Sequence, residues 1–265
     1  MICRVSISLL IGSVAIAASS AAASSRRLKD DDLRKLMEEA KKDVERFTDA
    51  VDSQYRKATI RTATSEVAIE GYLKDLKKSA ETMRDRFKED YAAGREVLSF
   101  LRQASAIEKR AAGGGGLFGA EKEWPRLRGT LGRLSQVYAV DWNANPDSWA
   151  ARRMNDRQLQ EAIGKFSNGA KSFKKSLESA LEHVNDVGKE ERKALMSAVD
   201  RLSSTADDLK DSVGDGGDPA GELGLLKAAT DEIQSFLEKH GLANAVGSTF
   251  RSLGADLSTI VTALN

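Results

Sequence analysis

Apolar residues recur along most of the chain at steps of three and four positions, with charged and polar residues between them. This spacing places apolar side chains on one stripe of a helix. The acidic run Asp30–Asp32 suits the positive end of a helix dipole and marks the start of the first such helix. We expect that helix to run from residue 30 to about residue 58, on the stripe Leu33, Leu36, Met37, Ala40, Val44, Phe47, Val51, Tyr55 and Ala58.

Seven further stretches repeat this periodicity and predict seven more helices. Breaks between them carry glycine, proline or short polar runs, which interrupt helices. The glycine run 113–116 is interpreted as a flexible connection, because no strand precedes it and no Lys-Ser/Thr follows it, as a phosphate loop requires. The expected helices cover residues 65–91, 95–112, 123–138, 156–184, 195–213, 223–237 and 246–264.

The apolar pattern of the second half matches that of the first half when it is shifted by 126 positions without a gap. The shift superposes Phe173 on Phe47, Leu202 on Leu76, and Phe250 on Trp124. Identical residues are few, but the stripes of four successive helices coincide. The fold class we predict is therefore all-α: two tandem, duplicated antiparallel four-helix bundles after a signal peptide.

The expected domain organisation follows from these breaks and from the apolar start of the chain. It comprises a signal peptide over residues 1–23, a basic neck over 24–30, helical repeat 1 over 31–140, a linker over 141–155 and helical repeat 2 over 156–265. About 240 residues after the leader suit two domains of ordinary size.

The leader combines an early charge at Arg4, an apolar run over residues 5–18 and small residues that offer cleavage after Ala23. These features are typical of a secretory signal peptide, and the run is shorter than the roughly 20 residues of a membrane span. Cleavage after Ala17 and a retained anchor are the alternatives. The chain is expected to be periplasmic or secreted. Cys3 is the only cysteine, so the mature protein depends on packing rather than on disulfides.

Charge is balanced along the chain. It has 41 Lys and Arg against 40 Asp and Glu, and the loss of Arg4 with the leader leaves 40 of each. A nucleic-acid-binding protein normally carries a basic excess that neutralises phosphates. The composition therefore argues against a nucleic-acid partner.

Candidate chemistry is sparse, and we predict no enzyme activity, no metal and no cofactor. The two histidines, His183 and His240, lie near predicted helix C-termini and have no cysteine, histidine or paired carboxylate at ligand spacing. Near a C-terminus a cationic ring meets the negative end of the helix dipole. The sequence has no G-x-S-x-G element of a serine hydrolase.

A tryptophan, spaced leucines and Y-x-V-x-W together form a longer motif near the middle of the chain. It consists of Trp124, Leu127, Leu131, Leu134, Tyr138, Val140 and Trp142. It resembles a motif of uncharacterised secreted bacterial helical proteins that often carry such units in tandem. The second copy departs from it, with Phe250 at the tryptophan position. The resemblance implies a helical fold and a compartment but no chemistry.

We interpret the chain as a non-enzymatic module that presents helix faces to an unknown protein partner, or as a structural module. Candidate interaction residues are Tyr138, Trp142, Trp149, Arg152 and Arg153, because Tyr, Trp and Arg dominate binding hot spots. An equally open interpretation is that these aromatic residues join the two bundles to each other.

Two further alternatives remain for the function. Reversible binding to lipid or to an envelope surface through amphipathic helices is possible but is not favoured by a neutral chain. The short pattern formed by Arg26, Leu28 and Asp30 resembles the R-x-L-x-E/Q/D processing element of proteins exported by some intracellular parasites.

Overall fold

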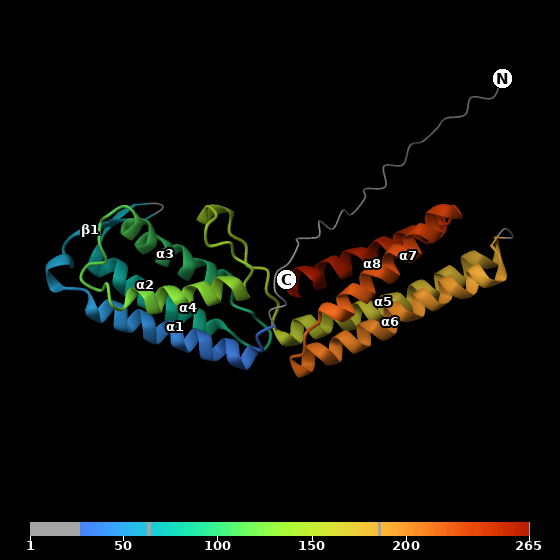
Figure 1. Cartoon of the computed structure of the whole chain (residues 1–265), viewed down its shortest axis with the longest axis horizontal. Coiled ribbons are helices and arrows are strands. Elements are labelled where there is room, and N and C mark those ends of the chain that lie inside the picture. The colour runs from blue at the N-terminus through green and yellow to red at the C-terminus, as the bar shows by residue number, and fades with distance from the viewer. Residues whose placement is uncertain (1–26, 63–64, 185–186, 265) are drawn as a thin grey trace, which may run out of the picture.

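A computed structural model of the chain describes residues 27–62, 65–184 and 187–264. Its helices form two groups that lie end to end along the long axis of the molecule (Figure 1). The described residues confirm an all-α fold of helical bundles. The first group comprises α1 (Asp30–Ala50), α2 (Ile69–Arg86), α3 (Gly94–Ala112) and α4 (Trp124–Val137), and the second α5 (Asp156–Glu182), α6 (Lys189–Asp215), α7 (Ala220–Lys239) and α8 (Ala243–Leu264).

The same helices are neighbours in each group. In the first, α1 packs against α2 and α4, α2 packs against α3, and α3 touches α4 over a smaller area. In the second, α5 packs against α6 and α8, α6 packs against α7, and α7 touches α8 over a smaller area. The order of helices within one group is therefore repeated in the other.

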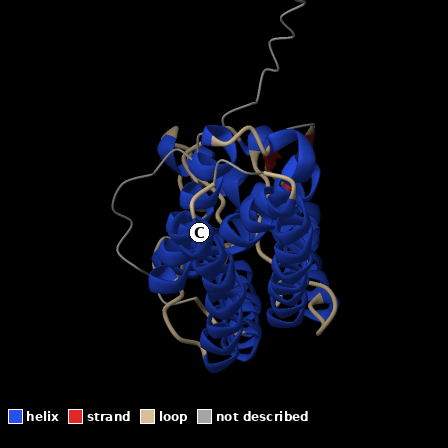
Figure 2. Cartoon of the chain, turned by 90° about the vertical axis from the view of Figure 1, so that its right-hand side faces the viewer, coloured by secondary structure: helices blue, strands red, loops and turns tan. Residues whose placement is uncertain are grey.

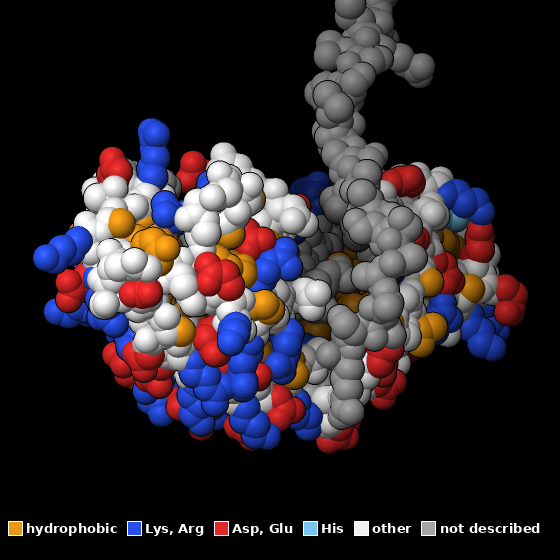
Figure 3. All heavy atoms as spheres, turned by 60° about the vertical axis from the view of Figure 1, so that its left-hand side comes forward, with side chains coloured by type: hydrophobic (Ala, Val, Ile, Leu, Met, Phe, Trp, Pro, Cys, Tyr) orange, Lys and Arg blue, Asp and Glu red, His pale blue; other side chains and the backbone are white. Residues whose placement is uncertain are grey.

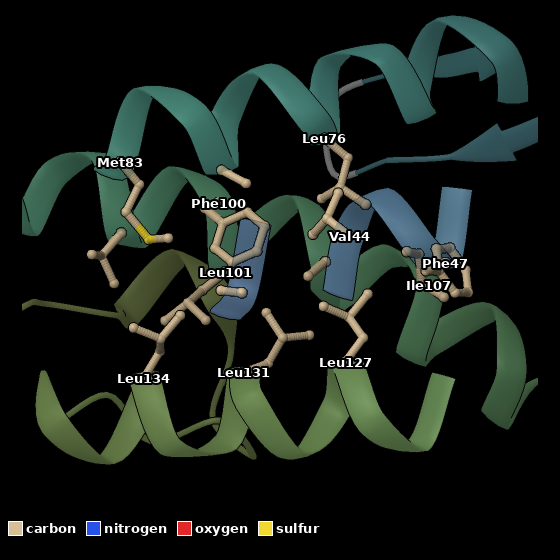
Figure 4. Close-up of a cluster of buried hydrophobic side chains, with 14 of the residues drawn as sticks. Val44, Phe47, Leu76, Met83, Phe100, Leu101, Ile107, Leu127, Leu131 and Leu134 are labelled. Carbon is tan, nitrogen blue, oxygen red and sulfur yellow. The ribbon is translucent and has the colours of Figure 1, made fainter. Parts of the chain in front are cut away.

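Each group encloses its own hydrophobic core. All four helices of the first bundle supply it, with Val44 and Phe47 facing Leu76, Phe100 and Leu127 across the interior (Figure 4). Full burial of each such side chain stabilises the fold by roughly 1.5–3 kcal/mol. The second core is a separate cluster built from α5 to α8, including Leu159, Phe166, Leu209, Ile233 and Leu257.

One aromatic contact occurs at corresponding places in the two cores. The rings of Phe47 and Trp124 lie 5.6 Å apart in the first core. The rings of Phe173 and Phe250 lie 5.4 Å apart in the second. Each pair joins the first helix of its bundle to the last, so Phe250 performs the packing role that Trp124 has in the first bundle.

The prediction that the first helix continues to residue 58 is wrong. Helix α1 ends at Ala50, and Val51 is extended. Asp52 then caps a single 3-10 turn, η1 (Ser53–Tyr55), by accepting a hydrogen bond from the backbone N–H of Gln54. The backbone N–H of Asp52 also donates to the carbonyl of Phe118 at 2.9 Å, which holds the chain out of the helical path.

A short hairpin replaces the expected start of the next helix. Strands β1 (Thr59–Arg61) and β2 (Glu66–Ala68) pair antiparallel, with Ile60 opposite Val67. β-Branched residues favour this extended conformation. Among the described residues these are the only strands, and they lie at one edge of the helical mass (Figure 2). The second bundle has longer helices instead: α5 and α6 each have 27 residues, against 21 in α1 and 18 in α2.

A buried carboxylate links α1 to α4 in the first bundle. Asp43 is 1% exposed and accepts hydrogen bonds from Arg126 Nε at 2.7 Å and from Thr130 Oγ1 at 2.8 Å. The carboxylate is therefore paired with an arginine and fully hydrogen-bonded on both oxygens, as burial of a charge requires.

Replacing Asp43 with Ala should lower the free energy of unfolding by about 2 kcal/mol, because the Thr130 hydroxyl is left buried without its charged acceptor. Urea titration followed by circular dichroism measures this loss. Asp49→Ala, on the same helix, removes an exposed carboxylate that pairs with Lys77 and should change stability by less than about 0.5 kcal/mol. Equal effects of the two substitutions would contradict the structural role of Asp43.

Candidate functional site

The N-termini of α1 and α5 meet at the centre of the molecule, and the two helices run from there in opposite directions (Figure 1). Four residues precede or begin each helix: Arg27–Asp30 and Arg153–Asp156. We call these two segments together the joint. The joint is the candidate site, because it connects the two bundles and contains one of the candidate interaction residues, Arg153.

Each helix is capped by the first residue of the other helix. The backbone N–H of Asp30 donates to Oδ2 of Asp156 at 3.0 Å, and the backbone N–H of Asp156 donates to Oδ2 of Asp30 at 2.8 Å. Helix N-termini have unsatisfied N–H groups and a partial positive charge, and carboxylates satisfy both. The two positive helix ends can therefore lie together, because the carboxylate of each aspartate accepts a hydrogen bond from the first N–H of the other helix.

Two buried arginines neutralise these aspartates. Arg153 Nη2 donates to Asp30 Oδ1 at 2.8 Å and to the carbonyl of Leu28 at 2.8 Å. Arg27 pairs with Oδ1 of Asp156, and its Nη2 donates to the carbonyl of Met154 at 2.8 Å. The side chains of Arg27 and Arg153 are only 8% and 3% exposed. Pairing and hydrogen bonding offset the large cost of taking these charges out of water.

Two outer contacts extend the joint along its edges. Lys29 Nζ donates to the carbonyl of Gly214 at 3.2 Å, and Asn155 Nδ2 donates to the carbonyl of Lys88 at 3.4 Å. Each of these hydrogen bonds between the halves thus has a counterpart. Adding 126 to the residue number in the first half, and subtracting 126 from the residue number in the second half, gives the two partners of that counterpart, as for Asp30 and Asp156. The arrangement is isologous, because each half uses the same positions to bind the other.

Ionisation of the joint reflects burial and pairing. Partial burial acts to raise the pKa of the Asp156 carboxyl, but the hydrogen bonds from Arg27 and from the Asp30 N–H, together with the charges of Arg27 and Arg153, hold that pKa below its usual value. Burial and the neighbouring charge of Arg27 lower the pKa of Arg153, against the hydrogen bond and charge of Asp30. The carboxylate of Asp156 is therefore stabilised in its charged form.

Three of the five candidate interaction residues are committed to contacts within the chain. Tyr138 is fully buried, and its hydroxyl donates to the carbonyl of Ala92 at 2.5 Å. Burial raises the pKa of this hydroxyl. Trp149 is 6% exposed and its Nε1 donates to the carbonyl of Ala144 at 3.2 Å. Arg153 is the third, in the joint.

The other two candidates are more accessible. Trp142 is partly buried and stacks on Trp149, with ring centroids 5.4 Å apart and planes 28° apart. It borders a groove of about 290 Å³ beside α4 that Arg128 and Gln136 also line. Arg152 is exposed. Of the five candidate interaction residues, Trp142 and Arg152 are therefore the two that are accessible to a partner.

The segment 141–149 packs on the first bundle rather than between the bundles. Trp149 belongs to the first hydrophobic core, and Trp142 and Ala144 lie against it. Arg102 of α3 fixes the segment by donating to the carbonyls of Pro146 at 2.9 Å and Trp149 at 3.2 Å. In the described part of the chain, the hydrogen bonds between the bundles come from the charged and polar residues around Asp30 and Asp156.

Sequence reasoning missed Arg27, Asp30 and Asp156 as contact residues, although a signal was present. Arg27-Leu28-Lys29-Asp30 and Arg153-Met154-Asn155-Asp156 share the pattern arginine, large apolar residue, any residue, aspartate. The two occurrences are separated by the repeat spacing. The charges were interpreted as a solvated neck and a helix start, because one copy of the pattern gives no indication of its partner.

Both histidines lie at helix ends. His183 follows α5, where its Nδ1 lies 2.9 Å from the carbonyl of Ser179, and His240 follows α7, where its Nε2 lies 3.6 Å from Glu191. Over the described ranges no set of three His, Cys, Asp or Glu side chains is grouped as a metal site requires. No helix in those ranges has the length and apolar content that would span a membrane.

Ala23, the predicted cleavage position, and Arg26 lie outside the described residues. Comparison of the chain with protein-family models, curated proteins and solved structures finds no match. The resemblance to secreted bacterial helical proteins therefore stays a prediction.

Arg153→Ala should open the joint. It leaves the Asp30 carboxylate, which is 14% exposed, without its arginine, and breaking such a pair costs about 3 kcal/mol. Because each bundle has its own core, we expect small-angle X-ray scattering to show a larger maximum dimension while circular dichroism keeps its helical signal. Arg157→Ala is the matched control, since its pair with Glu161 is exposed on both sides. An unchanged scattering curve for Arg153→Ala would show that the joint does not depend on this pair.

The joint should also weaken at low pH. The pKa of Asp156 in the folded protein is below its ordinary value of 3.8, so its stabilisation is complete above that value and is lost as the pH falls through the folded pKa. We expect fluorescence energy transfer between labels on the two bundles to fall below about pH 4. In Asp156→Asn this titration should be reduced, whereas Asp147→Asn, which changes an exposed carboxylate, should leave it unchanged. Identical titration of wild type and Asp156→Asn would refute the assignment.

Proposed function

We propose that the protein is a non-enzymatic, secreted or periplasmic structural or interaction module, in which the joint holds two helical bundles in one relative orientation. The observation that carries the fixed orientation is the reciprocal contact of Arg27 and Asp30 with Arg153 and Asp156, whereas the proposed location rests on the predicted leader. A network of directional hydrogen bonds fixes orientation more strictly than an apolar contact, because its bonds form in only a narrow range of geometries.

We further propose that the two bundles arose by duplication. Support comes from the shared order of helix neighbours, from the aromatic pairs Phe47–Trp124 and Phe173–Phe250, and from the spacing of the joint contacts. Helices α1 and α5 also begin at positions separated by that same spacing, as do α3 and α7. Independent helices would not be expected to agree in both position and contacts.

The proposed interaction surface includes Trp142 and Arg152, on and just after the segment that Arg102 fixes. A tryptophan held by stacking loses little side-chain freedom on contact, and an exposed arginine offers several hydrogen-bond donors to a partner. Elsewhere the visible surface carries charges of both signs side by side, with apolar atoms in small areas (Figure 3). Such a mixed surface is typical of a solvated exterior.

The test is a crosslinking pull-down from the native envelope or secreted fraction with the full mature chain. A protein captured by the wild type should be lost with the double variant Trp142→Ala, Arg152→Ala. Arg157→Ala, which removes an exposed arginine from α5, is the matched control and should retain it. Capture of the same protein by all three forms would contradict the assignment of this surface, provided that circular dichroism shows the variants folded.

A further inference from the structure

A second groove lies on the first bundle, along α3 between strand β1 and the 3-10 turn η2 (Pro146–Ser148). Its volume is about 510 Å³, within the usual range of small-molecule sites. It is separate from the joint and from the Trp142 groove, and the proposed function does not use it.

Cations dominate the polar lining of this groove. Arg61 comes from β1 and Arg102, Lys109 and Arg110 come from α3, whereas Asp147 is the one carboxylate among the lining residues. Within the described residues, none of these four cations forms an ion pair with a carboxylate. A local basic excess in an otherwise neutral chain attracts anions.

The preference of basic residues for helix C-termini does not by itself account for these four cations. Lys109 and Arg110 lie in the last turn of α3, where basic residues are favoured. Arg61 is on a strand, and Arg102 lies in the middle of the helix. Two structural elements, β1 and α3, therefore bring positive charge to one groove.

Arg110 lines the groove and is restrained by packing on an aromatic ring. Its Cζ atom lies 4.4 Å from the centroid of the Phe118 ring, and its buried Nε has no hydrogen-bond partner. Gly115 allows this position, because a Cβ atom there would lie 2.8 Å from Arg110 Cγ. Arg102 is also fixed, since its Nε and Nη2 are bonded to the segment 146–149. Fixed guanidinium groups bind carboxylate or phosphate oxygens with little loss of side-chain entropy.

The floor of the groove is apolar. Ile60 is 1% exposed and Ala106 is 7% exposed, and both line it. An inorganic anion would leave the apolar atoms of the groove in contact with water, whereas a neutral apolar molecule would leave Arg61, Lys109 and Arg110 without a negatively charged group to pair with. The lining therefore fits a molecule that has both a negatively charged group and an apolar part.

We propose that this groove binds a small amphipathic anion, with a carboxylate or phosphate-monoester head against Arg61, Lys109 and Arg110 and a short apolar body on Ile60 and Ala106. We assign the occupant as a small molecule free in solution, and sedimentation with vesicles distinguishes it from a lipid within a membrane.

Titration calorimetry with the full mature chain tests the chemical class. Octanoate and octyl phosphate, below their micelle concentrations, should bind at least about tenfold more tightly than octanol or inorganic phosphate. Octanol binding as tightly as octanoate would refute the role of the cations. Inorganic phosphate binding as tightly as octyl phosphate would refute the role of the floor, and failure of both amphiphiles to bind would overturn the proposal.

Variants test the residues. Arg110→Gln and Lys109→Gln should each weaken octyl phosphate binding about tenfold. Gly115→Ala should also weaken it, because the added methyl group displaces Arg110 while every charge is kept. Arg157→Gln, far along the chain on α5, should bind as the wild type does. If circular dichroism shows folded variants and all of them bind equally, the groove is not the site.

Sedimentation with phosphatidylglycerol vesicles distinguishes the two sources of such an anion. We expect the wild-type protein to cosediment with these vesicles no more than the Lys109→Gln variant does. Binding to vesicles without binding to monomeric octyl phosphate would overturn it in favour of a membrane surface.

Discussion

The arrangement of the molecule depends on how two helix N-termini can meet head to head. Each N-terminus carries roughly half a positive charge and several N–H groups without partners, so an uncompensated meeting would be repulsive. Asp30 and Asp156 solve this by capping each other's helices, and Arg27 and Arg153 then balance the two carboxylates. Two buried arginines and two partly buried aspartates, with balanced charge, thus lie together. The first N–H of each helix is satisfied by the aspartate of the other helix, and α5 in addition has its own capping box from Asn155 and Gln158.

The joint differs in kind from the cores that it connects. The cores are large apolar clusters, and their stability follows from area removed from water, which tolerates small changes of angle. The joint is made of hydrogen bonds and ion pairs, which lose most of their energy when distances and angles change slightly. Internal cohesion of each bundle and relative placement of the bundles therefore rest on different interactions. The segment 141–149 contributes to the cohesion of the first bundle and not to the placement of the two bundles. Trp149 lies in the core of that bundle, and Arg102 holds the backbone around it.

The apolar stripes predicted the all-α class and most helix positions, because a buried helix face requires apolar residues at steps of three and four along the sequence. The stripe at Val51, Tyr55 and Ala58 was misleading, since a local cap at Asp52 and pairing of Ile60 with Val67 outweigh periodicity there. Tyr138 and Trp149 were recognised as special residues, but composition cannot tell a buried aromatic residue from an exposed anchor. The joint could not be predicted from either half alone, because each aspartate caps a helix that begins 126 residues away. The cationic groove likewise combines residues from a strand, a helix and a loop that are separated in sequence.

Reciprocity at the joint distinguishes this arrangement from a linear array of helical units. A head-to-tail contact between repeats leaves one binding face open at each end, so that further units can be added and terminal caps are needed. Here the two bundles use the same positions against each other, so the hydrogen bonds of the joint are made within this pair of bundles. The far end of each bundle takes no part in them. The first bundle has its hairpin between α1 and α2, whereas the second has continuous helical turns in α5 and α6. The two bundles thus correspond in their contacts at the joint and differ in structure at their far ends.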